Sequence, residues 1–156
     1  MVFSFFGLPG ISWDRIDARM TAEFPAVPLI EAAELAELYG TQVQPVVIDV
    51  RADEEFVVSR LPEALHLENA GEVVTLLEEK NTPIVVYCAV GFRSAAMAQE
   101  LTDLGYSNVR NLKHSIFAWA DAGRPLFNGK GKTTKVHPYN QRWGRLVSRA
   151  LHAYQP

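Results

Sequence analysis

The sequence predicts an α/β fold in which a parallel β-sheet is covered by helices on both faces. Residues 46–48 and 84–87 are uninterrupted runs of apolar, mostly β-branched residues, as expected for strands buried on both faces. Helical patterns separate these runs, and strands that alternate with helices favour a parallel sheet. In such sheets the functional loops follow the carboxyl ends of the strands. A chain of 156 residues is long enough for one such domain.

Three helices are predicted around these two strands. Residues 31–39 place their apolar side chains along one stripe. A second stripe follows Asn69, whose side chain is suited to a helix N-cap, and ends before Pro83. From residue 94 onward, apolar residues recur at helical spacing until Gly105, which is a C-terminal stop signal.

A short strand near Val109 and a helix through residues 117–119 complete the predicted core. Residues 12–22 and 138–153 each show an apolar stripe at helical spacing and are predicted to be helices outside the core. Residues 128–134 are rich in Gly, Lys and Thr, which predicts a flexible loop. The predicted organisation is an N-terminal extension, a core domain and a basic C-terminal extension, at residues 1–27, 28–126 and 127–156.

Charge is distributed unevenly along the chain. Residues 1–123 contain 18 acidic and 8 basic side chains, whereas residues 124–156 contain 7 basic and no acidic ones. We therefore expect the C-terminal extension to dock on an acidic surface, either the body of the same chain or a second subunit of a homodimer. Nucleic acid is not an expected partner, because a body with a net charge of −10 would repel a polyanion.

The chain has one cysteine, Cys88, which excludes an intramolecular disulfide and a cysteine-based metal cluster. The four histidines show no ligand spacing, so we predict neither a metal nor a cofactor. No apolar run is long enough to span a bilayer. The apolar start at residues 1–6 lacks a preceding basic residue, so it does not predict a signal peptide. We interpret it as a chain end packed on the body, with a weak membrane-surface contact as the alternative, and expect no stable membrane association. The expected location is the cytoplasm, where a lone thiol stays reduced.

Cys88 directly follows the strand at residues 84–87 and precedes a helix, which is the position of a functional loop. The thiolate is the nucleophile, but a free thiol with a pKa near 8.5 is mostly protonated at neutral pH. The N–H groups of the following helix, an inward-facing amide nest permitted by Gly91 and the charge of Arg93 would each favour the anion. The alternative is a buried and inert cysteine. We predict Cys88 as the catalytic nucleophile and a substrate-binding loop formed by Ala89, Val90, Gly91, Phe92 and Arg93.

The segment Cys-Ala-Val-Gly-Phe-Arg-Ser at residues 88–94 resembles the C-x-x-G-x-R-S active loop of single-domain rhodaneses, which are sulfurtransferases. Other family patterns follow in the right order: D-V-R with E-F at residues 49–56, I-P-G-A at 61–64 and A-W-x-x-A-G-x-P-L at 117–126. The resemblance implies the rhodanese-like fold over residues 28–126. It also implies that Cys88 carries a sulfane sulfur as a persulfide. A small anionic donor, such as thiosulfate or a persulfide, would supply that sulfur, and a thiol or protein acceptor would receive it.

The sequence departs from the family pattern at five positions. Ser59-Arg60 stands where the family has Gly-His, and Glu63 stands at its turn glycine. His114-Ser115 replaces its Gly-Gly. His114 is either a replacement without a role or a hydrogen-bonding group at the mouth of the site. These changes do not affect the predicted fold, but this chain need not share the usual substrates of the family.

Two other functions are compatible with this fold. Phosphatases and arsenate reductases have a loop with one residue more, so the four residues between Cys88 and Arg93 favour sulfur transfer. A non-enzymatic rhodanese-like binding or regulatory module is the second alternative, and the intact cysteine argues against it. Arg51 is interpreted as a structural ion-pair partner of Asp49 or Glu55.

Overall fold

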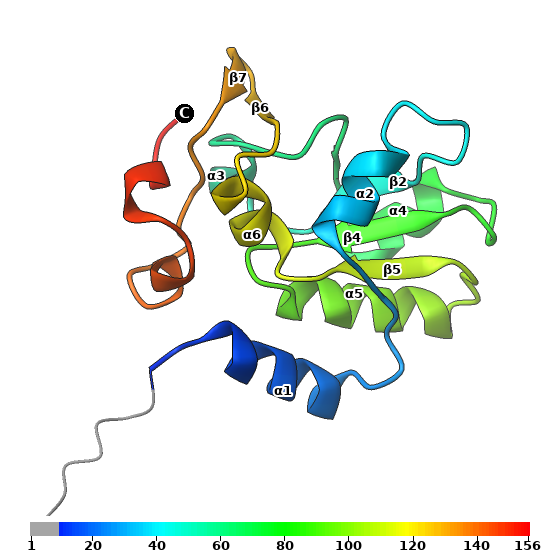
Figure 1. The fold of residues 1–156 in the computed structure, drawn as a ribbon. Helices are drawn as coiled ribbons and strands as arrows, with labels where there is room; N and C mark the ends of the chain where they lie inside the picture. Colours follow the sequence, from blue (N-terminus) through cyan, green and yellow to red (C-terminus); the bar gives the residue numbers. More distant parts are fainter. Residues whose placement is uncertain (1–9) are drawn as a thin grey trace, which may run out of the picture.

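The protein contains a five-stranded parallel sheet with helices on both faces (Figure 1). The structure is a computed structural model that describes residues 10–156. The strands follow the order β1-β5-β4-β2-β3 across the sheet, so β4 lies in the middle. Their bounds are Leu29–Ile30 for β1, Val46–Asp49 for β2, Leu65–His66 for β3, Ile84–Tyr87 for β4 and Val109–Leu112 for β5. The α/β prediction is confirmed, and β2 and β4 are the two strands that it rested on.

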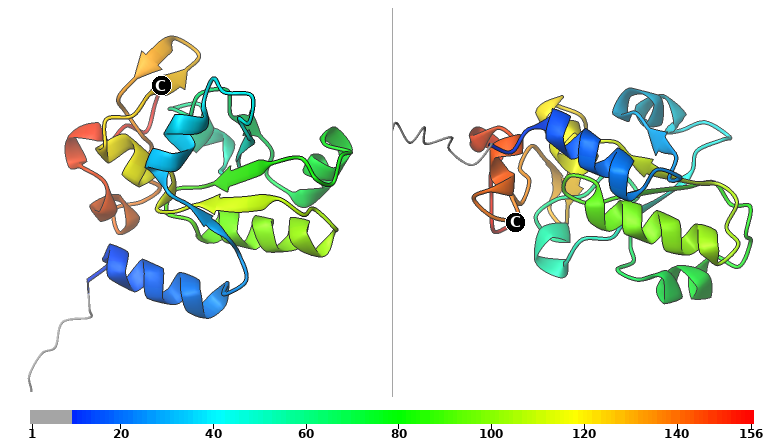
Figure 2. Two further views of the ribbon diagram at one scale, coloured as in Figure 1. Left: turned by 45° about the vertical axis from the view of Figure 1, so that its right-hand side comes forward. Right: turned by 90° about the horizontal axis from the view of Figure 1, so that it is seen from below.

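The two faces of the sheet carry separate apolar clusters. Along β4, Val85 and Tyr87 belong to one cluster, and Ile84 and Val86 belong to the other, as strand alternation requires. Side chains of α1, α2 and α6 join the first cluster, and side chains of α4 and α5 form part of the second. Figure 2 shows the arrangement of these helices around the sheet. The helix bounds are Trp13–Glu23 for α1, Ala32–Leu38 for α2, Asp53–Phe56 for α3, Ala70–Leu76 for α4, Phe92–Asp103 for α5 and Ser115–Asp121 for α6.

Helix ends follow the capping residues that the sequence indicates. Ser12 accepts a hydrogen bond from the amide of Arg15 at 3.4 Å, so α1 begins where the cap predicts. Asn69 does the same for α4 by accepting from the amide of Glu72 at 3.0 Å.

No helix among residues 10–156 is long and apolar enough to cross a membrane. The apolar start at residues 1–6 lies outside the described residues.

The C-terminal extension is not the continuous helix predicted over residues 138–153. It forms two short 3₁₀ turns, Trp143–Leu146 and Arg149–Leu151. Tyr139 has a left-handed backbone with φ 67°, which a helix does not permit. At Gly144, a Cβ atom would lie 3.0 Å from side-chain atoms of both Pro138 and His152, so the extension folds tightly back on itself there. The predicted helix is therefore wrong, because close packing around glycine prevails over the apolar spacing.

The loop predicted at residues 128–134 is instead most of a β-hairpin. Strands β6 (Leu126–Asn128) and β7 (Gly131–Thr133) pair in antiparallel fashion, with two residues between them. The backbones of Arg60 and Phe127 exchange two hydrogen bonds, of 2.9 and 3.0 Å, which attach this hairpin to the core. The prediction of a flexible loop is wrong, since backbone pairing gives this Gly- and Lys-rich segment a regular structure.

The C-terminal extension packs on the body of the same chain. Val136, Leu146 and Val147 are buried and belong to the same apolar cluster as the first face of the sheet. The backbone amide of Ser148 donates to Asp121 at 2.8 Å. Within the part of the chain that the structure describes, Arg142, Arg145 and Arg149 form no ion pair, although the charge distribution predicts docking on an acidic surface. Apolar burial, supported by hydrogen bonds, therefore holds the extension in place.

Leu146→Ala is expected to lower the free energy of unfolding by about 2 kcal/mol, at the low end for a buried leucine at the edge of a core. Leu146 is 7% exposed and contributes to the core cluster. Leu76→Ala is the matched control, because Leu76 is 55% exposed. Urea unfolding of both variants measures the difference. Equal, small losses in the two variants would show that the extension does not stabilise the domain.

Candidate active site

Cys88 lies at the carboxyl end of the central strand β4, in a tight loop that leads into α5. Its side chain is buried, and the backbone amide of Gly91 donates a hydrogen bond to Cys88 Sγ at 3.1 Å. Gly91 has φ 122°, a conformation that favours glycine. A Cβ atom there would also lie 3.1 Å from the side chain of Met20 in α1. The glycine therefore permits the turn that brings a backbone donor to the sulfur.

Hydrogen bonds from β5 and α6 hold the loop. The amide of Cys88 donates to Ser115 Oγ at 3.1 Å. In return, the first amides of α6 reach back to the loop: Ile116 N donates to Cys88 O at 3.1 Å, and Phe117 N donates to Ala89 O at 3.2 Å. These contacts leave the backbone around the sulfur little freedom to move, so the loop amides are oriented before any substrate binds.

A buried polar pair supports the loop from below the sulfur. The hydroxyl of Ser94 lies 2.6 Å from Asn111 Oδ1 and 3.4 Å from Cys88 Sγ. The Asn111 amide donates to the carbonyl of Gly91 at 3.0 Å. Because a hydroxyl has one hydrogen, the shorter contact indicates that Ser94 donates to Asn111. The 3.4 Å contact of the Ser94 hydroxyl with Cys88 Sγ is then the weaker of the two.

Arg93 does not extend its guanidinium freely towards a substrate. Its two terminal nitrogens donate to the two carboxylate oxygens of Glu55, at 2.8 and 2.9 Å. Burial raises the pKa of Glu55, but the hydrogen bonds and charge of Arg93 outweigh burial, and the pKa is held below its ordinary value. Glu55 is therefore ionised at neutral pH and compensates the charge of Arg93. The sequence-based expectation of a free donor fork at Arg93 does not match this geometry.

A fully buried ion pair lies at the carboxyl end of β2, beside the end of β4. Arg51 donates to both carboxylate oxygens of Asp49, at 2.9 and 2.7 Å, and Tyr87 donates to the same carboxylate at 2.6 Å. All three side chains are fully buried. The interpretation of Arg51 as a structural ion-pair partner holds for Asp49, while Glu55 pairs with Arg93 instead. Tyr87 immediately precedes Cys88, so this network fixes the strand end that carries the cysteine.

Glu55→Gln is expected to reduce the loss of stability in acid. The folded pKa of Glu55 lies below its ordinary value of about 4.5, so below that pH the unfolded chain binds more protons than the folded chain. Stability from Glu55 is therefore present above pH 4.5 and is lost as the pH falls through the folded pKa. The variant should lack this pH-dependent contribution to the free energy of unfolding, whose slope is at most about 1.4 kcal/mol per pH unit. Denaturant unfolding at pH 5 and pH 3 measures it. Glu54→Gln, at the exposed neighbouring position, is the control, and an equal slope in both variants would contradict the assignment.

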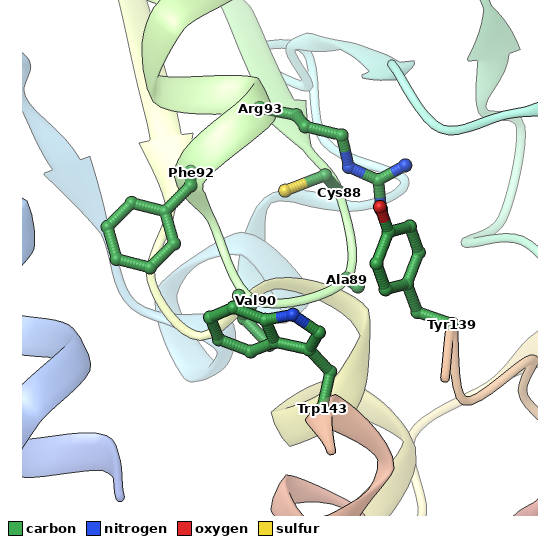
Figure 3. Close-up of a pocket in the computed structure, with 7 residues that line it drawn as sticks. All are labelled: Cys88, Ala89, Val90, Phe92, Arg93, Tyr139 and Trp143. Carbon is green, nitrogen blue, oxygen red and sulfur yellow. The ribbon is translucent and has the colours of Figure 1, made fainter. Parts of the chain in front are cut away.

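The sulfur opens into a pocket of about 120 Å³. Figure 3 shows Cys88 with Phe92 and Trp143 on one side and Arg93 and Tyr139 on the other. The predicted loop residues Ala89 and Val90 also line this pocket, while Gly91 contributes its amide. Tyr139 and Trp143 come from the C-terminal extension, and the sequence did not predict them as residues of the site. In the sequence these two residues stand out only as aromatic residues beyond the core domain. That pattern does not show where their side chains lie in the folded chain.

Three of the replaced family positions keep a glycine-like backbone. Glu63, His114 and Ser115 have φ values of 57°, 59° and 47°. Such a conformation costs a residue with a Cβ atom roughly 1–2 kcal/mol. Ser115 offsets the cost with its hydroxyl, which accepts from Cys88 N and donates to the carbonyl of Leu112 at 3.1 Å. The replacements therefore preserve the local turns and add side-chain contacts.

His114 is one of these replacements, and its ring lies outside the Cys88 pocket. It stacks on Trp13 with the ring centroids 4.1 Å apart, and it lies within hydrogen-bond distance of Asp17, at 2.7 Å. Both partners belong to α1. His114 therefore attaches the N-terminal extension to the core, which is neither of the two roles considered from the sequence.

One group of possible metal-ligating side chains occurs on the surface. Ligand atoms of Asp53, His66 and Glu68 lie within 4.8 Å of one another. His66 Nε2 is already 2.5 Å from the carbonyl oxygen of Arg51, and the side chain of Asp53 is 85% exposed. His66 contacts Asp53 at 3.3 Å and Glu68 at 3.4 Å, so the three side chains form a group of surface contacts.

The fold places the single cysteine in a loop between the central strand β4 of a parallel sheet and helix α5. Residues 31–122 match the model of the rhodanese-like domain, and the chain belongs to this family. Both chain ends, including Tyr139 and Trp143, lie outside the matched residues. The α/β fold predicted from the sequence is thus the rhodanese-like fold.

Several relatives of this chain are named as sulfurtransferases. A sulfurtransferase from Allochromatium vinosum is 29% identical over 103 residues, which cover 65% of this chain and 96% of the relative. The thiosulfate sulfurtransferase GlpE from Actinobacillus succinogenes is 34% identical over 88 residues, covering 55% and 78%. The crystal structure of a rhodanese-related protein from Thermoplasma volcanium is similar, with a TM-score of 0.55, 28% identity and coverage of 64% and 96%. These similarities support a place among the sulfurtransferases.

Proposed function

We propose that this protein is a sulfurtransferase that carries a sulfane sulfur as a persulfide on Cys88. The observation that carries the proposal is the position of Cys88 Sγ at the start of α5, where Gly91 N donates to it at 3.1 Å. The first amides of α5 have no acceptor within the helix, so they are available to a negatively charged sulfur. The sulfurtransferase relatives support the same chemistry.

In the proposed reaction the Cys88 thiolate attacks the sulfane sulfur of a donor. A bond forms between Cys88 Sγ and that sulfur, the bond to the rest of the donor breaks, and the donor leaves with the electron pair. A thiol or protein acceptor then takes the sulfur and regenerates Cys88. The substrate-binding loop in this proposal is Ala89, Val90, Gly91, Phe92 and Arg93. We further propose that the protein works in a reducing compartment such as the cytoplasm, where its single thiol stays free.

Sulfur transfer to cyanide, measured beside the hydrolysis of an aryl phosphate, tests this function. Four residues separate Cys88 from Arg93, and the amide of Gly91 within this loop donates to Cys88 Sγ at 3.1 Å. We expect measurable transfer from thiosulfate or an organic persulfide, and no phosphate release above the uncatalysed rate. Phosphate release without sulfur transfer would overturn the proposal in favour of a phosphatase. The absence of both activities would favour a binding module.

A further inference from the structure

The C-terminal extension supplies two aromatic walls to the pocket over Cys88. The ring of Tyr139 lies against the guanidinium of Arg93, with the ring centroid 4.8 Å from Cζ. The ring of Trp143 meets Phe92 edge to face, with the centroids 6.2 Å apart. Figure 3 shows these rings around the opening that leads to the sulfur. The outer part of the pocket is therefore shaped by residues beyond the family match.

The charge of the pocket disfavours a strongly anionic donor. Among the described residues that line it, Arg93 is the one with a positively charged side chain, and the ionised carboxylate of Glu55 compensates that charge. Tyr139 covers a face of the same guanidinium. A dianion such as thiosulfate would lose hydration on entry and would meet no net positive charge besides the backbone amides at the sulfur.

The dimensions and lining of the pocket suit a small apolar group. Its volume of about 120 Å³ is close to that of a cavity of about 150 Å³ that binds benzene. Phe92, Tyr139 and Trp143 offer ring faces and edges, which pack favourably against another ring or a short hydrocarbon. The amide of Gly91 contacts the sulfur of the buried Cys88, whereas Tyr139 is 46% exposed, so the aromatic lining reaches the surface.

We propose that the sulfur donor is a small organic persulfide whose apolar carbon group packs against Tyr139 and Trp143. This inference rests on the proposed sulfurtransferase function and specifies its substrate class. The Cys88 thiolate attacks the terminal sulfur of R–S–S–H, the S–S bond of the donor breaks, and R–S⁻ leaves with the electron pair. The product on the protein is Cys88–S–S–H, so atoms and charge balance without an external oxidant or reductant.

Steady-state sulfur transfer to cyanide tests the inference with two donors, benzyl persulfide and thiosulfate. The wild-type protein is expected to use benzyl persulfide with a kcat/KM at least about tenfold higher than thiosulfate. Trp143→Ala and Tyr139→Ala should each lower kcat/KM for benzyl persulfide about tenfold, while the value for thiosulfate changes less than about twofold. The tenfold figure corresponds to the loss of one favourable aromatic contact with its buried area. Tyr154→Ala is the control, because Tyr154 is an exposed tyrosine of the same extension outside this pocket.

The outcomes separate the donor class from the reaction itself. Higher activity of the wild-type protein with thiosulfate, or equal losses with both donors in Tyr139→Ala and Trp143→Ala, would overturn the inference and leave the sulfurtransferase function standing. If neither donor loads sulfur onto Cys88, the proposed function fails and the inference fails with it. Tyr139 is 46% exposed, so its variant should fold even where Trp143→Ala is destabilised.

Discussion

Cys88→Ser is expected to lower the rate of sulfur transfer at least about 1000-fold, as for the loss of other catalytic nucleophiles. A serine hydroxyl in this loop would remain protonated, whereas a thiol can supply the nucleophilic anion. Cys88 is the only cysteine of the chain, so no other thiol can take over the reaction. The measurement is kcat/KM for sulfur transfer to cyanide.

The same variant should fold normally. The loop backbone is held by the hydroxyl of Ser115 and by the amides of Ile116 and Phe117, and the substitution removes none of these contacts. Thermal unfolding of Cys88→Ser should therefore remain close to that of the wild-type protein. Transfer that persists in the folded variant would show that Cys88 does not carry the sulfur.

Asp49→Ala is expected to lower the free energy of unfolding by about 3–5 kcal/mol, the usual cost of removing one partner of a buried ion pair. The substitution would leave the fully buried guanidinium of Arg51 without its carboxylate, and the hydroxyl of Tyr87 without its acceptor. Such a loss is a large part of the stability of an ordinary domain.

Asp53→Ala is the control for this prediction, since the side chain of Asp53 is 85% exposed. We expect a change within about 0.5 kcal/mol for the control, as for most surface substitutions. Denaturant unfolding of both variants provides the comparison. A loss below about 1 kcal/mol in Asp49→Ala would mean that the buried pair does not stabilise the strand end before Cys88.

The centre of the fold could be predicted from sequence because its signals are local. Apolar runs identify β2 and β4, capping residues set the starts of α1 and α4, and Gly91 indicates the turn after Cys88. Strands β1 and β3 have two residues each, so they are too short to show a periodic pattern. Their pairing depends on neighbours that are distant in the chain.

The rest of the site depends on contacts that spacing does not reveal. Glu55 and Arg93 are 38 residues apart in sequence, and only the folded chain brings their side chains together. Tyr139 and Trp143 show an apolar spacing typical of a helix, yet the chain turns tightly at Gly144 and directs both rings to the pocket. Tertiary packing prevailed there over local pattern, and the outer pocket could not be foreseen.

Intact-protein mass spectrometry tests most directly whether Cys88 carries the transferred sulfur. The purified protein is incubated with a sulfane-sulfur donor, freed of small molecules and measured with and without a thiol reductant. We predict a mass increase of one sulfur atom, located on the peptide that contains Cys88 and removed by the reductant. Sulfur transfer by a protein whose mass never increases, or an equal increase in Cys88→Ser, would show that Cys88 does not carry the sulfur.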